Sequence, residues 1–220
     1  KALLTRVMTR DISKLRPGRV TYCCWCDDAG KVMDDGTVSN LGDGHYRVTA
    51  AEPTFGWLHR NARGLDLEIT DTTDEIGALA IQGPTARAIL SEVVKDTPRP
   101  LEALKFFRLT KAAIAGQPVI VSRTGYTGDL GYEVWVARDQ ALPVWDAIVA
   151  AGSRHGLVAA GLDALDVTRV EAGFIMNGVD YNSANHCLIE SRKSSPYELG
   201  LGWTVDLDRA PVTGQAALRN

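Results

Sequence analysis

The sequence predicts an α+β fold of two packed antiparallel α/β modules, and three observations support this prediction. The chain of 220 residues is 45% hydrophobic and 23% charged, the balance of a globular protein with a sizeable core. Short stretches of alternating apolar and polar residues are bounded by Gly, Asp and Pro, which favours hairpins. The order helix, strands, helix, strand occurs twice, over residues 1–70 and 83–160, which we interpret as a weak structural repeat.

The first half of this repeat begins with an amphipathic helix, because KALLTRVM places apolar residues every three to four positions. Strands are predicted over VTYCCWC, VMDDGTVSNL and YRVTA, with turns at DDAGK and DGH between them. A helix then runs from Pro53 until Gly64, and LDLEIT alternates as one further strand.

The second half repeats this order. A helix is predicted over GPTARAILSEVVKD, followed by strands FFRLTKAAIA, QPVIVSRTG and YEVWVA and a helix over DQALPVWDAIVAAG. A third helix, GLDALDVTRVEAGF, places Asp166 and Arg169 three residues apart, so we expect them to be neighbours on its surface. The turn-rich stretch from NGVDY to LGLGW is predicted to be a long loop, and such loops are usually functional or mobile.

Charge and composition exclude several classes of partner. The net charge is -3 with both signs interspersed, and without a basic stripe we expect no nucleic acid partner. No apolar run approaches the roughly 18 residues that span a bilayer, so we expect no membrane partner. Four cysteines, three of them clustered, are too few for a disulfide framework. A reducing compartment fits best, and we predict a cytoplasmic location.

Metal binding is not expected. Cys23, Cys24 and Cys26 lie in a predicted strand, which sends neighbouring side chains to opposite faces, and no second cysteine or histidine pair completes four ligands. We therefore interpret these cysteines as packing residues. The four histidines are scattered along the chain without metal-ligand spacing.

Two acidic positions are candidates for chemistry. In GKVMDDGTV, strand alternation points Asp34 and Asp35 to opposite faces, so only one of them faces a given pocket. Glu133 follows the corresponding hairpin of the second half. We hypothesise that two carboxylates converge between the modules; a solvated turn with one edge acid is the alternative.

The stretch SRTGYTGDLGYEVWV combines three glycines with this acid. Because a strand follows the glycines, there is no helix N-terminus to hold a phosphate. A carboxylate instead matches two parallel N–H donors, such as the ring N–H and the exocyclic amine of a pterin. Glycines would let the main chain approach a flat ring. A glycine-rich hairpin without function is the alternative.

Five segments together resemble the glycine-cleavage T-protein (aminomethyltransferase) family. RTGYTGDLGYEV resembles its RTGYTGExGxE segment, and AGLDALDVTRVEAG its AGLxARDxLRxEAG helix. GKVMDDGTV, ALAIQGPTA and ELGLGW are similar to its GGxxDDLIV, LALQGP and ExGLGW. The resemblance implies the family's folate-binding fold without its C-terminal barrel domain. It implies a first, ferredoxin-like module over residues 1–80, a second module with folate-binding loops over 81–206, and the start of the barrel over 207–220.

Site residues follow from the resemblance by position. Asp35 corresponds to the family's catalytic carboxylate and Glu133 to the glutamate that holds the pterin. Arg169 lines the folate or substrate pocket, and Tyr126 is a pocket neighbour. Thr49 stands where an asparagine is expected near the folate.

The family also implies a function, a tetrahydrofolate-dependent one-carbon transferase of the aminomethyltransferase kind. Its cofactor is tetrahydrofolate, and its partner is a small-molecule one-carbon donor or a lipoyl carrier protein. Departures from the family pattern affect the pocket: LYGxDI appears as IMNGVDY, with Asn177 where tyrosine is usual. A folate-dependent demethylase of a small S-, N- or O-methyl compound, or a non-catalytic folate-binding protein, therefore remains open.

Overall fold

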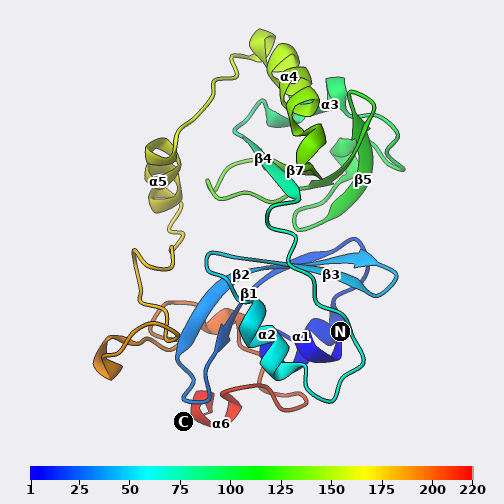
Figure 1. Cartoon of the computed structure of the whole chain (residues 1–220). Coiled ribbons are helices and arrows are strands. Elements are labelled where there is room, and N and C mark those ends of the chain that lie inside the picture. The colour runs from blue at the N-terminus through cyan, green and yellow to red at the C-terminus, as the bar shows by residue number, and fades with distance from the viewer. Residues whose placement is uncertain (220) are drawn as a thin grey trace. The chain divides into compact units, whose positions relative to one another are not determined.

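The computed structural model describes residues 1–219, which form two compact units (Figure 1). The first unit comprises Lys1–Thr70 and the residues from Ile175 onward, and the second comprises Asp71–Phe174. These divisions differ from the domain boundaries predicted after residues 80 and 206. The physical reasons are that residues 76–82 form a strand of the second sheet, and that residues 175–206 pack against the first sheet.

A three-stranded antiparallel meander is the centre of the first unit. Its order is β1-β2-β3, formed by β1 (Val20–Cys26), β2 (Val32–Gly42) and β3 (His45–Ala50). No helix separates these strands, so the order differs from the βαββαβ order of a ferredoxin-like module. The helices are α1 (Ala2–Val7), α2 (Phe55–Asn61) and the short α6 (Gln215–Leu218).

Strand alternation gives the first sheet two different faces. Cys23 and Trp25 pack with the apolar residues of α1 and with Leu58 of α2. Cys24 and Cys26 point to the other face, where the late segment of the chain covers them through a cluster that includes Tyr181 and Leu201. The three clustered cysteines are therefore buried packing residues.

The second unit contains a four-stranded antiparallel sheet of order β4-β7-β6-β5. Its strands are β4 (Ile76–Gln82), β5 (Leu109–Ile114), β6 (Gln117–Ser122) and β7 (Gly131–Ala137). Its helices are α3 (Ala86–Val93), α4 (Ala141–Gly152) and α5 (Leu162–Glu171). Buried residues of α3 and α4 form one core with every second residue of β7, namely Tyr132, Val134 and Val136.

The predicted repeat is present as helix, three-stranded meander, helix. The first unit has α1, β1-β2-β3 and α2, and the second has α3, β5-β6-β7 and α4, with β4 added beside β7. The strand predicted over LDLEIT is wrong: residues 65–70 form no strand and are largely exposed. Strand β4 was not predicted, because its sequence IGALAIQ has little alternation.

Gln82 of β4 explains two glycines of the glycine-rich stretch. It lies opposite Gly131 across the strand pair, and its Nε2 donates to the carbonyl oxygen of Tyr132 at 3.1 Å. A Cβ on Gly131 would lie 1.7 Å from Gln82 Oε1, and a Cβ on Gly125 would lie 2.0 Å from the same atom. The two glycines thus make room for a side chain of the protein itself.

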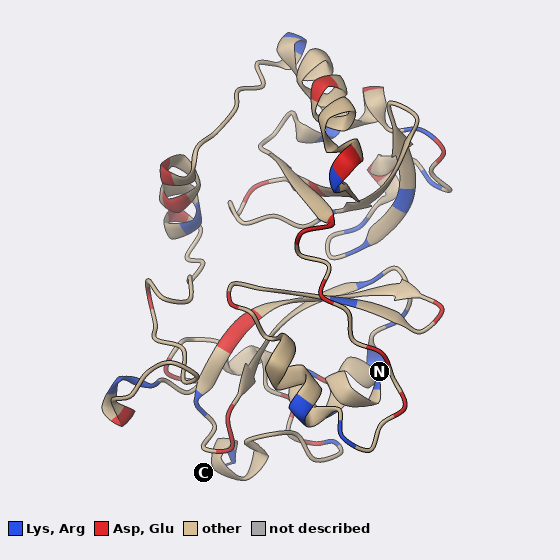
Figure 2. Cartoon of the chain, in the orientation of Figure 1, with Lys and Arg blue, Asp and Glu red and all other residues tan. Residues whose placement is uncertain are grey.

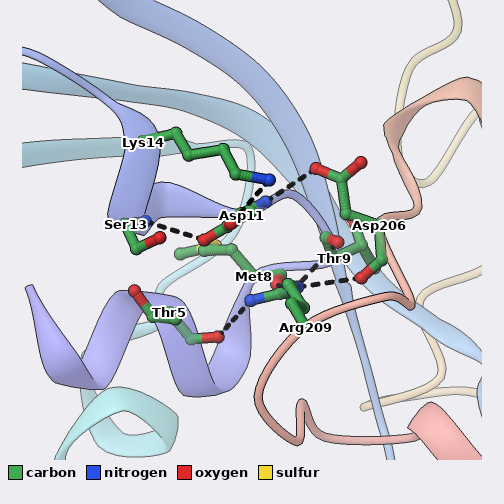
Figure 3. A network of polar contacts seen from close by, with 8 residues as sticks. All are labelled: Thr5, Met8, Thr9, Asp11, Ser13, Lys14, Asp206 and Arg209. Atoms are coloured by element: carbon green, nitrogen blue, oxygen red, sulfur yellow. Dashed lines mark hydrogen bonds and ion pairs between the residues drawn. The ribbon is translucent and has the colours of Figure 1, made fainter.

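Arg209 joins the late segment of the chain to the first helix (Figure 3). Its guanidinium donates to the carbonyl oxygens of Thr5 at 2.5 Å, of Met8, and of Thr9 at 3.1 Å. These carbonyl groups lie at the end of α1, where the helix provides no further N–H partners. Asp206 Oδ2 accepts from the backbone N–H of Asp11 at 2.9 Å and completes the connection.

We predict that Arg209→Gln lowers the free energy of unfolding by about 2 kcal/mol. The substitution removes the charged guanidinium, and three carbonyl oxygens then lose their hydrogen-bond donor. Denaturant unfolding measures this loss. Arg219→Gln is the control, since Arg219 is exposed and donates to one carbonyl group, that of Leu207. An equal loss of unfolding free energy in both variants would contradict a special role of the Arg209 contacts.

We predict that Gly131→Ala is destabilising by about 1–3 kcal/mol, because the new methyl group displaces Gln82. In a Gln82→Ala background the same substitution becomes nearly neutral, and a double-mutant cycle measures the difference. Gly161→Ala is the control, because a Cβ there meets nothing within 4 Å. Equal costs of Gly131→Ala in the two backgrounds would show that Gln82 is not the reason for the glycine.

Candidate functional site

Asp34 is a buried carboxylate with a full set of donors. It is 2% exposed, and its Oδ1 accepts from the backbone N–H of Asp35 and from Asn177 Nδ2, each at 2.9 Å. Its Oδ2 accepts from the backbone N–H of Glu52 at 3.0 Å. Because a buried carboxylate is costly without such partners, Asp34 has a structural role.

Asp35 lies on the other face of β2, as strand alternation predicts. It pairs with Cys24 of β1, whereas Asp34 pairs with Trp25. The Tyr22 hydroxyl donates to Asp35 Oδ2 at 2.7 Å, and the Tyr181 hydroxyl donates to Oδ1 at 2.5 Å. Both oxygens of the carboxylate are thereby fixed in place.

The surroundings of Asp35 set its ionisation. Burial raises the pKa of Asp35 above its ordinary value, the hydrogen bonds from Tyr181 and Tyr22 oppose this rise, and the nearby Asp34 adds to it. Burial and the Asp35 carboxylate raise the pKa of the Tyr181 hydroxyl well above its ordinary range. This shift favours the protonated Tyr181 hydroxyl, the form that donates to Asp35.

Aromatic contacts hold Tyr22 in this position. Its ring stacks on Trp203, with 5.9 Å between the ring centroids, and the Arg10 guanidinium lies 5.3 Å from the Trp203 ring centroid. Trp203 is 62% exposed, so this stack forms part of the molecular surface near Asp35.

Thr49 lies on the same face of the sheet as Asp35. It pairs with Thr37 across β2 and β3, and the two hydroxyl oxygens are 2.5 Å apart. Gly36 lies between these positions, and a Cβ there would be 1.9 Å from the carbonyl oxygen of Thr49. Asp35 and Thr49 thus lie on one face of the first sheet, and their roles toward a ligand stay a prediction.

Glu133 is half-buried in β7, on the face opposite to the core residues Tyr132 and Val134. Its Oε2 accepts from the Thr124 hydroxyl at 2.5 Å and from the Ser122 hydroxyl at 3.5 Å. Its Oε1 has no hydrogen-bond partner in the described part of the chain. Ala80, its cross-strand neighbour on β4, is small and exposed.

Arg169 and Tyr126 gather around the end of α5. The Arg169 side chain is buried, donates from Nε to Asp166 Oδ1 at 2.8 Å, and donates from Nη1 to the carbonyl oxygen of Phe174 at 3.0 Å. The Phe174 ring stacks on Tyr126, with 5.5 Å between centroids. The predicted proximity of Asp166 and Arg169 is confirmed.

The glycine stretch packs onto this same helix end. Gly128 has a φ of +73°, and a Cβ on it would lie 2.7 Å from the Ala172 Cβ. Together with Gln82 against Gly125 and Gly131, this contact gives each of the three glycines a reason within the protein. The expected approach of a ligand ring is therefore not needed to explain them.

The structure places the predicted residues in two groups. Asp35 and Thr49 belong to the first unit, and Glu133, Tyr126 and Arg169 belong to the second. The convergence of Asp35 and Glu133 on one ligand stays a prediction. Sequence reasoning missed the two tyrosines that donate to Asp35. Nothing in the sequence around Tyr22 indicated that its hydroxyl would contact an acid.

Other candidate sites lead to no assignment. Residues 1–219 contain no group of three or more His, Cys, Asp or Glu side chains that could hold a metal ion. A surface hollow of about 440 Å³ in the first unit is lined by residues such as Ser13, Arg16, Asn40 and Tyr46, and includes no predicted site residue. Figure 2 shows Lys and Arg spread over both units instead of gathered in one patch.

No helix in the described part of the chain has the length and apolarity that a membrane crossing requires.

Comparisons with known proteins agree with these features. The chain is 37% identical over 219 residues to an aminomethyltransferase of Halothermothrix orenii, covering 98% of this chain and 58% of that protein. It is 38% identical over 219 residues to a trimethylamine-oxide aldolase of Ruegeria pomeroyi, covering 96% of this chain and 27% of that protein. The chain thus spans less than two thirds of the length of these relatives.

A solved structure has the same fold. The crystal structure of the glycine cleavage system aminomethyltransferase T from Bartonella henselae matches with a TM-score of 0.80 at 23% identity, covering 99% of this chain and 56% of that chain. The family model of the GCVT N-terminal domain matches residues 1–209. The chain therefore belongs to the GCVT N-terminal domain family, as the five sequence segments indicated.

Proposed function

We propose that this chain is the folate-binding part of a tetrahydrofolate-dependent one-carbon transferase, with aminomethyltransferase as the first candidate. The observation that carries the proposal is Asp35, a largely buried carboxylate held by two tyrosine hydroxyls in a member of this family. Aminomethyltransferases are prominent among the relatives, at 32–38% identity.

The donor set around Glu133 fits a pterin. Thr124 and Ser122 fix Oε2, so the carboxylate has a defined orientation, while Oε1 remains an acceptor. A carboxylate has about four lone-pair positions, enough for these hydroxyls and for two ligand N–H groups. We therefore propose Glu133 as the residue that would hold the pterin, with Tyr126 and Arg169 lining the same pocket and Thr49 near the folate.

Bound tetrahydrofolate would supply the nucleophilic nitrogen that takes up the one-carbon unit. Asp35 would accept a proton at its carboxylate and stabilise positive charge that develops next to it. Tyr22 and Tyr181 would keep the two oxygens of this carboxylate oriented throughout. A largely buried carboxylate acts more strongly on a nearby charge than one in water.

A demethylase of a small methylated compound is the second candidate. The sequence is as similar to the trimethylamine-oxide aldolase as to the aminomethyltransferases. The family pattern also changes at Thr49, which lies on the Asp35 face of the first sheet, and at Asn177, which donates to Asp34. For a demethylase the one-carbon donor would be a small molecule, whereas for an aminomethyltransferase it would be carried by a lipoyl carrier protein.

A non-catalytic folate-binding protein is less favoured because Asp35 is retained. We propose a cytoplasmic location for all of them.

We predict that tetrahydrofolate raises the melting temperature of the protein, and that Glu133→Ala abolishes this rise because the pterin loses its acceptor. A thermal shift assay measures both. Glu75→Gln is the control, since Glu75 is an exposed carboxylate of the same unit. An undiminished rise with Glu133→Ala would refute the pterin assignment.

We predict that Asp35→Asn retains tetrahydrofolate binding but lowers turnover roughly 100-fold or more, because the proton acceptor is lost. Candidate one-carbon donors of both classes are tested for folate-dependent turnover. Asp43→Asn, in the turn between β2 and β3, is the control for loss of one negative charge. Equal turnover in the Asp35→Asn variant and the parent protein would exclude a catalytic role.

A further inference from the structure

We infer that the loop Asn177–Tyr181 positions the acid pair, with Tyr181 fixing Asp35 and Asn177 fixing Asp34. This inference rests on the proposed function, because it assigns a positioning role around the proposed catalytic carboxylate. One loop contacts both acids, although they point to opposite faces of β2.

The contact of Tyr181 with Asp35 is short and partly buried. The Tyr181 hydroxyl lies 2.5 Å from Asp35 Oδ1, and the Tyr181 side chain is 4% exposed in a cluster with Cys24 and Cys26. An ordinary hydrogen bond between a hydroxyl and a carboxylate measures about 2.5–2.7 Å. Because packing fixes the tyrosine ring, the hydroxyl has one position from which to donate.

The contact of Asn177 with Asp34 completes a set of neutral donors. Asn177 Nδ2 lies 2.9 Å from Asp34 Oδ1, beside the backbone N–H of Asp35 on the same oxygen. The other amide atom, Asn177 Oδ1, is buried and has no hydrogen-bond partner in the described part of the chain. An unpaired buried acceptor costs free energy, and the folded chain bears this cost at the contact that holds Asp34.

The loop itself is a closed turn. The backbone N–H of Gly178 donates to the carbonyl oxygen of Tyr181 at 2.9 Å, and that of Asp180 donates to Met176 at 2.9 Å. Asp180 Oδ2 accepts from the backbone N–H of Met176 at 2.8 Å, and Gly178 has a φ of +80° that favours glycine. The turn therefore fixes the spacing between Asn177 and Tyr181.

The sequence of the loop departs from the family pattern at both contacts. LYGxDI has tyrosine at the position of Asn177 and isoleucine at the position of Tyr181. In this chain the tyrosine stands at position 181, four residues after position 177, and its hydroxyl donates to Asp35. An isoleucine at 181 would leave Asp35 Oδ1 without this donor.

The charges around Asp35 make its ionisation depend on the Tyr181 hydroxyl. The ionisable groups that contact Asp35 are Tyr22 from β1 and Tyr181 from the loop, and Cys24 is its cross-strand neighbour; Asp34 and Cys23 act on it through space from the opposite face of the sheet. Burial, and to a smaller extent Asp34, disfavour the ionised carboxylate of Asp35 and raise its pKa. The two tyrosine hydroxyls are what stabilises the ionised form that accepts a proton.

The test is the titration of Asp35 itself, read by the ¹³C resonance of its carboxyl group in the full chain and assigned by its loss in Asp35→Asn. With Tyr181→Phe we expect the pKa of Asp35 to rise further, since one stabilising hydrogen bond is gone while the ring still packs. With 3-fluorotyrosine in place of Tyr181, a stronger donor, we expect it to fall. Tyr197→Phe is the control, because the Tyr197 hydroxyl donates to the carbonyl oxygen of Leu218.

A second readout is the pH profile of turnover. We expect Tyr181→Phe to lower kcat roughly tenfold near neutral pH, to move its acid limb to higher pH, and to leave the KM for folate within about twofold. An unchanged Asp35 titration in both Tyr181 variants, or an equal change in Tyr197→Phe, overturns the inference. The titration needs neither folate nor donor, so a failure of folate binding would refute the proposed function alone.

Discussion

The first unit depends on satisfying one buried carboxylate. Asp34 is 2% exposed and receives its donors from the chain itself: Asp35 on its own strand, Glu52 after β3, and Asn177 far along the chain. A buried acid without donors would be strongly destabilising. The sheet, the segment after it and the late loop are therefore tied together at a single side chain.

This constraint also orients the chemistry. Because side chains of a strand alternate, burying Asp34 on the helix-covered face obliges Asp35 to point to the other face. The late segment of the chain packs on that face and contributes Tyr181, and the neighbouring strand β1 contributes Tyr22. A structural acid and a candidate catalytic acid are adjacent in sequence for this reason, and neither could exchange its role with the other.

Patterns of local origin were the ones that could be predicted from the sequence. Alternation predicted the meander β1-β2-β3 and the opposite orientations of Asp34 and Asp35, and helical spacing predicted the contact between Asp166 and Arg169. What depends on distant partners could not be predicted. The stretch LDLEIT alternates but has no strand to pair with, whereas β4 alternates poorly and is recruited by β7. The tyrosines on Asp35 are separated by more than 150 residues, and only the folded chain joins them.

The glycine stretch has a structural explanation that its sequence alone did not reveal. Its glycines are needed, but for Gln82 and Ala172 instead of a ligand ring. Gln82, packed against Gly125 and Gly131, also donates to the carbonyl oxygen of Thr124, whose hydroxyl donates to Glu133. A preorganised carboxylate binds a ligand at lower entropic cost than a mobile one. If Glu133 holds the pterin as proposed, the three glycines would contribute to recognition through the packing of this hairpin.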